Sequence, residues 1–188
     1  MNKLLTMTFA AALLTAIAVP AADHNGKTIF VTGASFKSNL GGLAGADDKC
    51  QAEADGPESI VPSGTYMAWL SDGTDSPDTR FTKSAHPYML LDGTKIAENY
   101  TDLTDGSILH AINIDSTGKP LGALPFWTGT KADGTTAPLF VTCTGWKDPV
   151  PYHKGMHGQT NLTDSSWSTM HSNDSCRNRS YPLLCFQQ

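Results

Sequence analysis

The chain has 188 residues, a formal net charge of -5 and 16% charged residues, and its lysines and arginines are scattered rather than clustered. Nucleic acids and anionic membrane surfaces bind proteins through clustered basic side chains, so this composition excludes both as main partners. Glycine (17) and proline (11) are frequent, which is typical of a chain rich in turns.

Residues 1–21 have the pattern of a secretory signal peptide. Lys3 precedes an uncharged, apolar run over Leu4–Val19, and small residues end the segment at Ala21. The run is shorter than the roughly 20 residues that a membrane-spanning helix needs. We therefore expect cleavage after Ala21, secretion to the periplasm or the extracellular space, no membrane span, and one domain over residues 22–188.

A strand and a helix are the first elements predicted after the leader. Residues 28–32 are rich in β-branched and aromatic side chains and end at Gly33, which predicts a strand. From Leu43 to Ala54, apolar residues recur every three or four positions, which predicts a helix with one buried side. Cys50 lies on that side, so its partner is expected in the core.

The following segments predict strands joined by turns. The clearest is a hairpin in which Asp92-Gly93 joins residues 88–91 to residues 94–97, because Asp-Gly favours a type I′ turn. Other short apolar runs predict strands at residues 66–70, 108–114, 139–143 and 183–186. Residues 144–175 are polar and rich in glycine and proline, and predict a long irregular loop. Together these elements predict an α+β fold.

The four cysteines, Cys50, Cys143, Cys176 and Cys185, all follow the leader. An even number in a secreted chain predicts two disulfides, with three possible connectivities. A zinc site is the rival interpretation, but no Cys-x-x-Cys or Cys-x-x-His pair supports it. Cys143 and Cys176 bracket the predicted loop, which favours an ordered loop tied at its base.

Several segments, taken in their order and spacing, resemble one bacterial secreted family, which includes the leptospiral endostatin-like outer-membrane proteins. The segments are KTIFVT at 27–32, LGGLAGAD at 40–47, AWLSD at 68–72, PY at 87–88, DG at 92–93, LTDG at 103–106, WTGT at 127–130 and LCFQ at 184–187. They span nearly the whole chain after the leader.

The resemblance implies an endostatin-like or C-type-lectin-like fold, in which a short N-terminal helix region packs on a twisted, mostly antiparallel sheet with long loops. It also implies the disulfides Cys50–Cys185 and Cys143–Cys176. For the leptospiral relatives it implies attachment to host extracellular-matrix proteins and complement regulators. Heparin binding does not carry over, because the endostatin surface that binds heparin is arginine-rich and this chain is acidic.

The predicted loop and its flanks hold the candidate ligand-binding residues. These are Trp146, Tyr152, Trp167, Arg177 and Arg179, and their residue types are enriched at interface hot spots. The alternative for the two tryptophans is a place in the core beneath the loop.

Histidines are the candidate metal ligands. His153 and His157 are four residues apart and His171 adds a third imidazole, although solvated loop histidines are the alternative. Cleavage after Ala21 would make His24 the third residue of the mature chain. A free amine, two backbone amides and this imidazole would form a square-planar nitrogen set for Cu(II) or Ni(II), the alternative being a tail without a role.

A calcium-dependent sugar site of the C-type lectin kind is the last metal candidate. Asn173 and Asp174 precede Cys176, but Ser172 stands where the lectin motif has tryptophan, and half of the coordination sphere is missing. The alternative is that Asn173 and Asp174 build a turn.

No catalytic motif is present. The chain has no Gly-x-Ser-x-Gly elbow, Gly-rich phosphate loop or His-Glu-x-x-His run, and its thiols are expected to be bridged. We therefore expect a secreted, non-catalytic binding module without a cofactor, a monomer whose partner is an extracellular protein or glycan. The alternative is a metal-dependent (Cu, Zn or Ca) binding protein or enzyme on the same scaffold.

Overall fold

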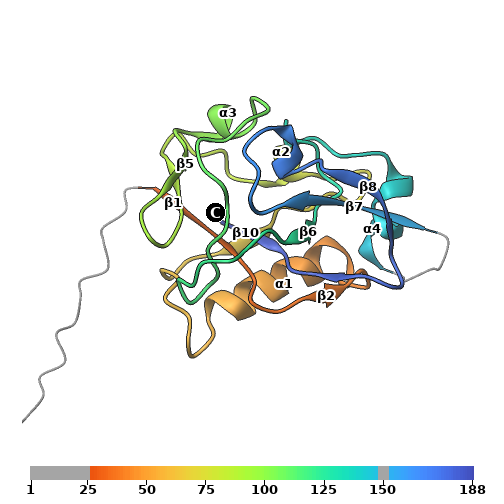
Figure 1. The fold of residues 1–188 in the computed structure, drawn as a ribbon, viewed down its shortest axis with the longest axis horizontal. Helices are drawn as coiled ribbons and strands as arrows, with labels where there is room; N and C mark the ends of the chain where they lie inside the picture. Colours follow the sequence, from red (N-terminus) through yellow and green to blue (C-terminus); the bar gives the residue numbers. More distant parts are fainter. Residues whose placement is uncertain (1–25, 148–152) are drawn as a thin grey trace, which may run out of the picture.

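The computed structural model describes residues 26–147 and 153–188 and has a mixed α+β fold, as the sequence predicts (Figure 1). The strands are β1 (Lys27–Val31), β2 (Phe36–Lys37), β3 (Tyr66–Ala68), β4 (Tyr88–Met89), β5 (Lys95–Ala97), β6 (Pro125–Trp127), β7 (Lys154–Gln159), β8 (His171–Ser175), β9 (Ser180–Tyr181) and β10 (Leu184–Gln187). The helices are α1 (Gly42–Ala54), α2 (Pro77–Arg80), α3 (Tyr100–Leu103) and α4 (Cys143–Trp146), with 3₁₀ turns η1 (Leu139–Val141) and η2 (Ser165–Trp167). The signal peptide, His24 and Tyr152 lie outside the described residues.

The largest sheet has five strands in the order β3-β10-β1-β4-β5. β10 pairs antiparallel with both β1 and β3, whereas β1 and β4 are parallel. Phe30 on β1 faces Cys185 on β10, and Cys185 in turn faces Ala68 on β3. β10 therefore lies inside this sheet, between β3 and β1.

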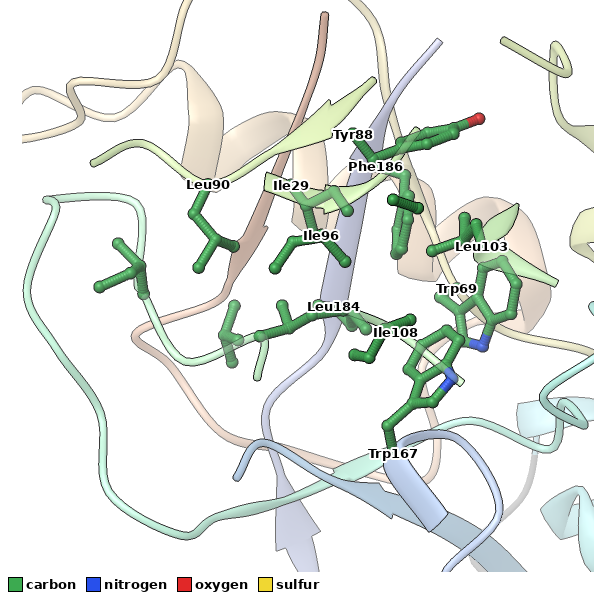
Figure 2. Close-up of a cluster of buried hydrophobic side chains, with 14 of the residues drawn as sticks. Ile29, Trp69, Tyr88, Leu90, Ile96, Leu103, Ile108, Trp167, Leu184 and Phe186 are labelled. Carbon is green, nitrogen blue, oxygen red and sulfur yellow. The ribbon is translucent and has the colours of Figure 1, made fainter. Parts of the chain in front are cut away.

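Alternation along the central strands divides the core into two layers. Ile29 on β1 and Phe186 on β10 belong to the layer that contains Trp69 and Trp167, whose side chains gather in Figure 2. Phe30 and Cys185 belong to the layer beneath α1. Successive side chains of a strand point to opposite faces, so the sequence of β1 and β10 fills both layers.

The helix predicted from residues 43 to 54 is confirmed as α1, which begins at Gly42. Cys50 on its buried side is bonded to Cys185, one of the pairs implied by the resemblance. Asp47 ties α1 to its surroundings, because its carboxylate accepts the Ala68 N–H (2.9 Å) and pairs with the Arg80 guanidinium. In the described part of the chain, no helix has the length and apolarity to cross a membrane.

The strands predicted near residues 28–32, 66–70 and 183–186 are confirmed with small shifts as β1, β3 and β10. The predicted hairpin exists as β4 and β5, but its type I′ turn is wrong. Among the two turn residues only Gly93 has a positive φ (86°), and the Gly93 N–H donates to the Leu90 carbonyl. This is the longer hairpin loop in which glycine takes the left-handed position.

Two predicted strands are wrong. The backbone of residues 108–114 bonds to unrelated partners, with the Ile108 N–H donating to Thr163 and the Leu109 N–H to Ile96, so no ladder forms. Residues 139–143 form η1 and the start of α4 instead of a strand. There the Thr142 hydroxyl donates to the Leu139 carbonyl (2.8 Å), a local bond that competes with strand pairing.

The long irregular loop predicted over residues 144–175 is also wrong, because it contains β7, η2 and β8. β6, β7 and β8 form an antiparallel sheet toward the right of Figure 1. β7 (KGMHGQ) and β8 (HSNDS) consist largely of glycine, histidine and other polar residues, which have low strand propensity by themselves. Their conformation follows from pairing with β6 and with each other.

We expect Asp47→Ala to lower the free energy of unfolding by about 2–4 kcal/mol, because it leaves the Arg80 guanidinium without its carboxylate in a largely buried site. Asp48→Ala is the matched control, since Asp48 is the exposed neighbour on the same helix. Urea unfolding of both variants measures the difference. Equal losses in the two variants would contradict the role assigned to Asp47.

Candidate functional site

The candidate site lies where β7, β8 and β9 meet, and its central group is the Asp174 carboxylate on β8. One oxygen of Asp174, Oδ2, accepts hydrogen bonds from the His157 Nδ1–H of β7 and from the Tyr181 hydroxyl of β9 (3.2 Å). The side chains of His157 and Asp174 are each 11% exposed. A nearly buried carboxylate thus joins three strands from two different sheets.

Strand register places these groups together. Across the β7–β8 pair, Gly155 faces Asp174 and His157 faces His171, with a shift in register between the two pairs. At Gly155 a Cβ atom would lie 2.6 Å from Cζ3 of Trp127 and 2.9 Å from Sγ of Cys143. Only glycine fits there, so β7 lies flat against the Trp127 ring and the disulfide sulfur.

An arginine and a second histidine lie near the buried carboxylate and His157. Arg179 Nε lies 3.9 Å from Asp174 Oδ1, and the arginine side chain is 59% exposed. The rings of His157 and His171 are 5.8 Å apart between centroids, and His171 is exposed. We call the surface formed by His157, His171, Asp174, Arg177, Arg179 and Tyr181 the β8 face.

Burial sets the protonation of the two partners of Asp174. Loss of solvation lowers the pKa of His157 below its ordinary value of 6.5, although the Asp174 carboxylate opposes this effect. Burial, with the nearby negative charge of Asp174, raises the pKa of the Tyr181 hydroxyl. At neutral pH, His157 is therefore a neutral imidazole whose Nδ1 proton points to Asp174, and Tyr181 is a neutral hydrogen-bond donor.

An aromatic stack supports the site from below. The Trp127 ring lies 4.5 Å from the Tyr181 ring and 5.6 Å from the Trp146 ring, measured between centroids. Trp127 Nε1 donates to the Phe36 carbonyl (2.9 Å) and Trp146 Nε1 to the Ser71 carbonyl (2.7 Å). Both indoles are fully buried, so their role is to hold the strands in place.

Next to this stack the backbone makes a left-handed turn. The φ angles of Cys143 (48°), Thr144 (56°), Gly145 (70°) and Trp146 (62°) are all positive. Each non-glycine residue in this conformation costs about 1–2 kcal/mol relative to the right-handed form. The Cys143–Cys176 disulfide holds the turn against the end of β8, and the exposed Thr144 hydroxyl contacts His153 Nδ1.

The structure separates the predicted ligand-binding residues into two groups. Arg177 and Arg179 are exposed beside the site. Trp146 and Trp167 are 0% and 1% exposed, so they belong to the core and cannot meet a ligand at the surface. The second predicted disulfide, Cys143–Cys176, is present.

The predicted metal ligands are not brought together in the described residues. His153 contacts Thr144, whereas His157 is bonded to Asp174. Within residues 26–147 and 153–188, no group of three or more His, Cys, Asp or Glu side chains is arranged to hold a metal ion.

Asp174 and Tyr181 were not among the predicted site residues. The sequence interpretation considered Asp174 as a calcium ligand or as a turn residue, but it lies on β8 with its side chain largely buried. Two strands of low intrinsic propensity had to be recognised before the register that pairs Asp174 with β7 could be seen. The one available signal was the Cys176 that follows Asp174, because it ties this segment to the core.

In residues 26–147 and 153–188, the His157–Asp174 pair has no hydrogen-bonded nucleophile of the kind found in a Ser-His-Asp triad. Among the described residues, no serine, threonine or cysteine side chain is hydrogen-bonded to His157, and the Cys143 sulfur is in a disulfide. Open pockets of about 370 Å³ beside Tyr100 and about 240 Å³ beside Glu53 lie away from the β8 face. The site can therefore offer hydrogen bonds and positive charge to a ligand at its surface.

Residues 33–163 match the family described as "Protein of unknown function (DUF1554)". The matched region begins just after β1 and ends after β7, so it includes Cys50, Cys143 and His157. A search of curated proteins finds no match.

We expect the free energy of unfolding to fall as the pH drops below 6.5, the ordinary His pKa, and His157 to contribute to this fall. A histidine whose pKa is lowered by folding takes up its proton more readily in the unfolded chain, so its stabilising contribution is present above that pH and lost below it. Urea unfolding at about pH 7.5 and about pH 5 compares wild type with His157→Gln, which should lose less stability. His86→Gln, at an exposed histidine, is the control. If His157→Gln and the wild type lose equal amounts, the assignment is wrong.

Proposed function

The chain belongs to the DUF1554 family of proteins of unknown function, and we propose that it is a secreted, non-catalytic module that binds an extracellular protein or glycan through the β8 face. The observation that carries this proposal is the Asp174 carboxylate, which fixes His157 and Tyr181 while Arg177 and Arg179 remain exposed beside them. A rigid surface binds with less loss of side-chain freedom than a loose one.

The distribution of arginine supports this choice of surface. Arg80 is the remaining arginine of the chain, and it is used inside the protein in the pair with Asp47. Both exposed arginines therefore lie in the short segment between β8 and β9 of an otherwise acidic protein. Arginine and tyrosine are residue types that dominate the energetics of interfaces.

The disulfides support an extracellular or periplasmic location, because such bonds persist in oxidising compartments.

The pairing of the cysteines also supports an endostatin-like or C-type-lectin-like fold. In the pattern that the resemblance implies, the helix cysteine pairs with the cysteine of the last strand and the two others pair inside. Cys50–Cys185 and Cys143–Cys176 follow this pattern, with β1 and β10 side by side.

An array of glycans and extracellular-matrix proteins tests the proposal. For a ligand found in this way, we expect Arg177→Gln/Arg179→Gln to weaken binding by about tenfold or more, because hot-spot arginines are removed. Lys119→Gln/Lys131→Gln removes the same charge from two exposed lysines elsewhere and should leave binding unchanged.

Equal losses in the two double variants would show that net charge, rather than the β8 face, controls binding. Metal analysis of the purified mature protein addresses the alternative of a metal-dependent module. A stoichiometric metal whose removal abolishes binding would overturn the non-metal proposal.

A further inference from the structure

The two disulfides join backbone segments of different kinds. Cys50 lies in the regular helix α1 and Cys185 in the regular strand β10. Cys143 lies in the left-handed turn with Thr144 and Trp146, the described non-glycine residues that have positive φ. All four cysteines are fully buried, so exposure does not distinguish the two bonds, whereas backbone strain does.

Several contacts keep the left-handed turn in place. Trp146 is anchored by its buried indole, and its carbonyl accepts the Gly41 N–H (3.2 Å). At the other end the Cys143–Cys176 bond ties the turn to β8. Hydrogen bonds from the Gly145 N–H (3.3 Å) and the Trp146 N–H (3.0 Å) to Thr142 also close the turn across Cys143 and Thr144. The disulfide is the covalent restraint on this half of the turn, and it ties the turn to the residue that follows β8.

We propose that the Cys143–Cys176 bond is a redox-sensitive clamp, which a dithiol reduces before Cys50–Cys185 and whose opening relaxes the turn and loosens β8. The bonds also differ in what they close. Cys143 and Cys176 are 33 residues apart, whereas Cys50 and Cys185 are 135 residues apart and join core elements. Closure of the longer loop restricts the unfolded chain more, so the stability of the fold depends more on Cys50–Cys185 than on Cys143–Cys176.

The reaction is a thiol–disulfide exchange that needs a dithiol as reductant. One thiolate of the dithiol attacks a sulfur of the Cys143–Cys176 bond, which forms a mixed disulfide and releases the other cysteine as a thiolate. The second thiol of the dithiol then displaces the attached cysteine. The protein gains two electrons and two protons as its disulfide becomes two thiols, and the dithiol loses the same and becomes a disulfide.

Opening the clamp would act on the β8 face because Cys176 follows β8 directly and Asp174 lies two residues before it. The effect on ligand binding rests on the proposed function, whereas the order of reduction does not. If the two disulfides are reduced in the expected order but the protein binds no ligand on the array, the proposal of the clamp stands and only the proposed function is overturned.

Graded reduction with dithiothreitol, followed by alkylation and peptide mass spectrometry, tests the order. We expect Cys143 and Cys176 to be alkylated at about tenfold lower dithiothreitol than Cys50 and Cys185. Hydrogen exchange of the partly reduced protein should be faster in β8 and unchanged in β10. Simultaneous reduction of both bonds, earlier reduction of Cys50–Cys185, or unchanged exchange in β8 would overturn the proposal.

A pair of substitutions isolates the strain. Thr144→Gly removes the Cβ that disfavours positive φ, whereas Thr144→Ala keeps the Cβ, and both remove the contact with His153. If strain drives the opening, Thr144→Gly should need about fivefold more dithiothreitol than Thr144→Ala. The same pair at Thr82, an exposed residue without positive φ, corrects for the general effect of glycine on chain freedom. Equal Gly-to-Ala differences at the two positions would show that strain in the turn does not drive reduction.

Discussion

The position of β10 between β1 and β3 is the constraint on which the rest of the structure depends. Through this strand the chain near its end pairs with the chain near its beginning, with Phe30 opposite Cys185. The neighbouring residues Phe186 and Cys185 pack into the two layers of the core, one on each side of the sheet. A shift by one residue would exchange these layers and separate Cys185 from Cys50, so the register, the helix position and the disulfide are fixed together.

The β8 face follows from this frame through a second set of contacts. Trp127 packs on Trp146 and Tyr181, and β7 can approach the Trp127 ring because Gly155 has no side chain. This places Asp174 where strands from different sheets converge. The site therefore depends on close backbone packing, and the packed rings of Trp127, Trp146 and Tyr181 beneath it keep its polar groups oriented.

Local pattern was informative where an element is specified by its own residues. The periodicity of α1 and the β-branched run of β1 were sufficient to predict both. β7 and β8 could not be predicted in the same way, since their glycine, histidine and small polar residues become strands only through their partners. The left-handed turn was equally hidden, because cysteine, threonine and tryptophan rarely adopt positive φ. The exposed arginines were found from residue type alone, but Asp174 required the register. The disulfide pairing came from the family resemblance and could not have come from spacing.

The central place of β10 also has a consequence for the order of events during synthesis. β1 and α1 are synthesised long before Leu184–Gln187, so the middle of the main sheet stays unfilled until β10 has been made. Cys143 and Cys176 both precede Cys185 in the chain, so during N-to-C synthesis they become available to Cys50 before its native partner does. An oxidising compartment thus offers Cys50 a wrong partner first, and correct maturation requires either late oxidation or reshuffling of an early bond.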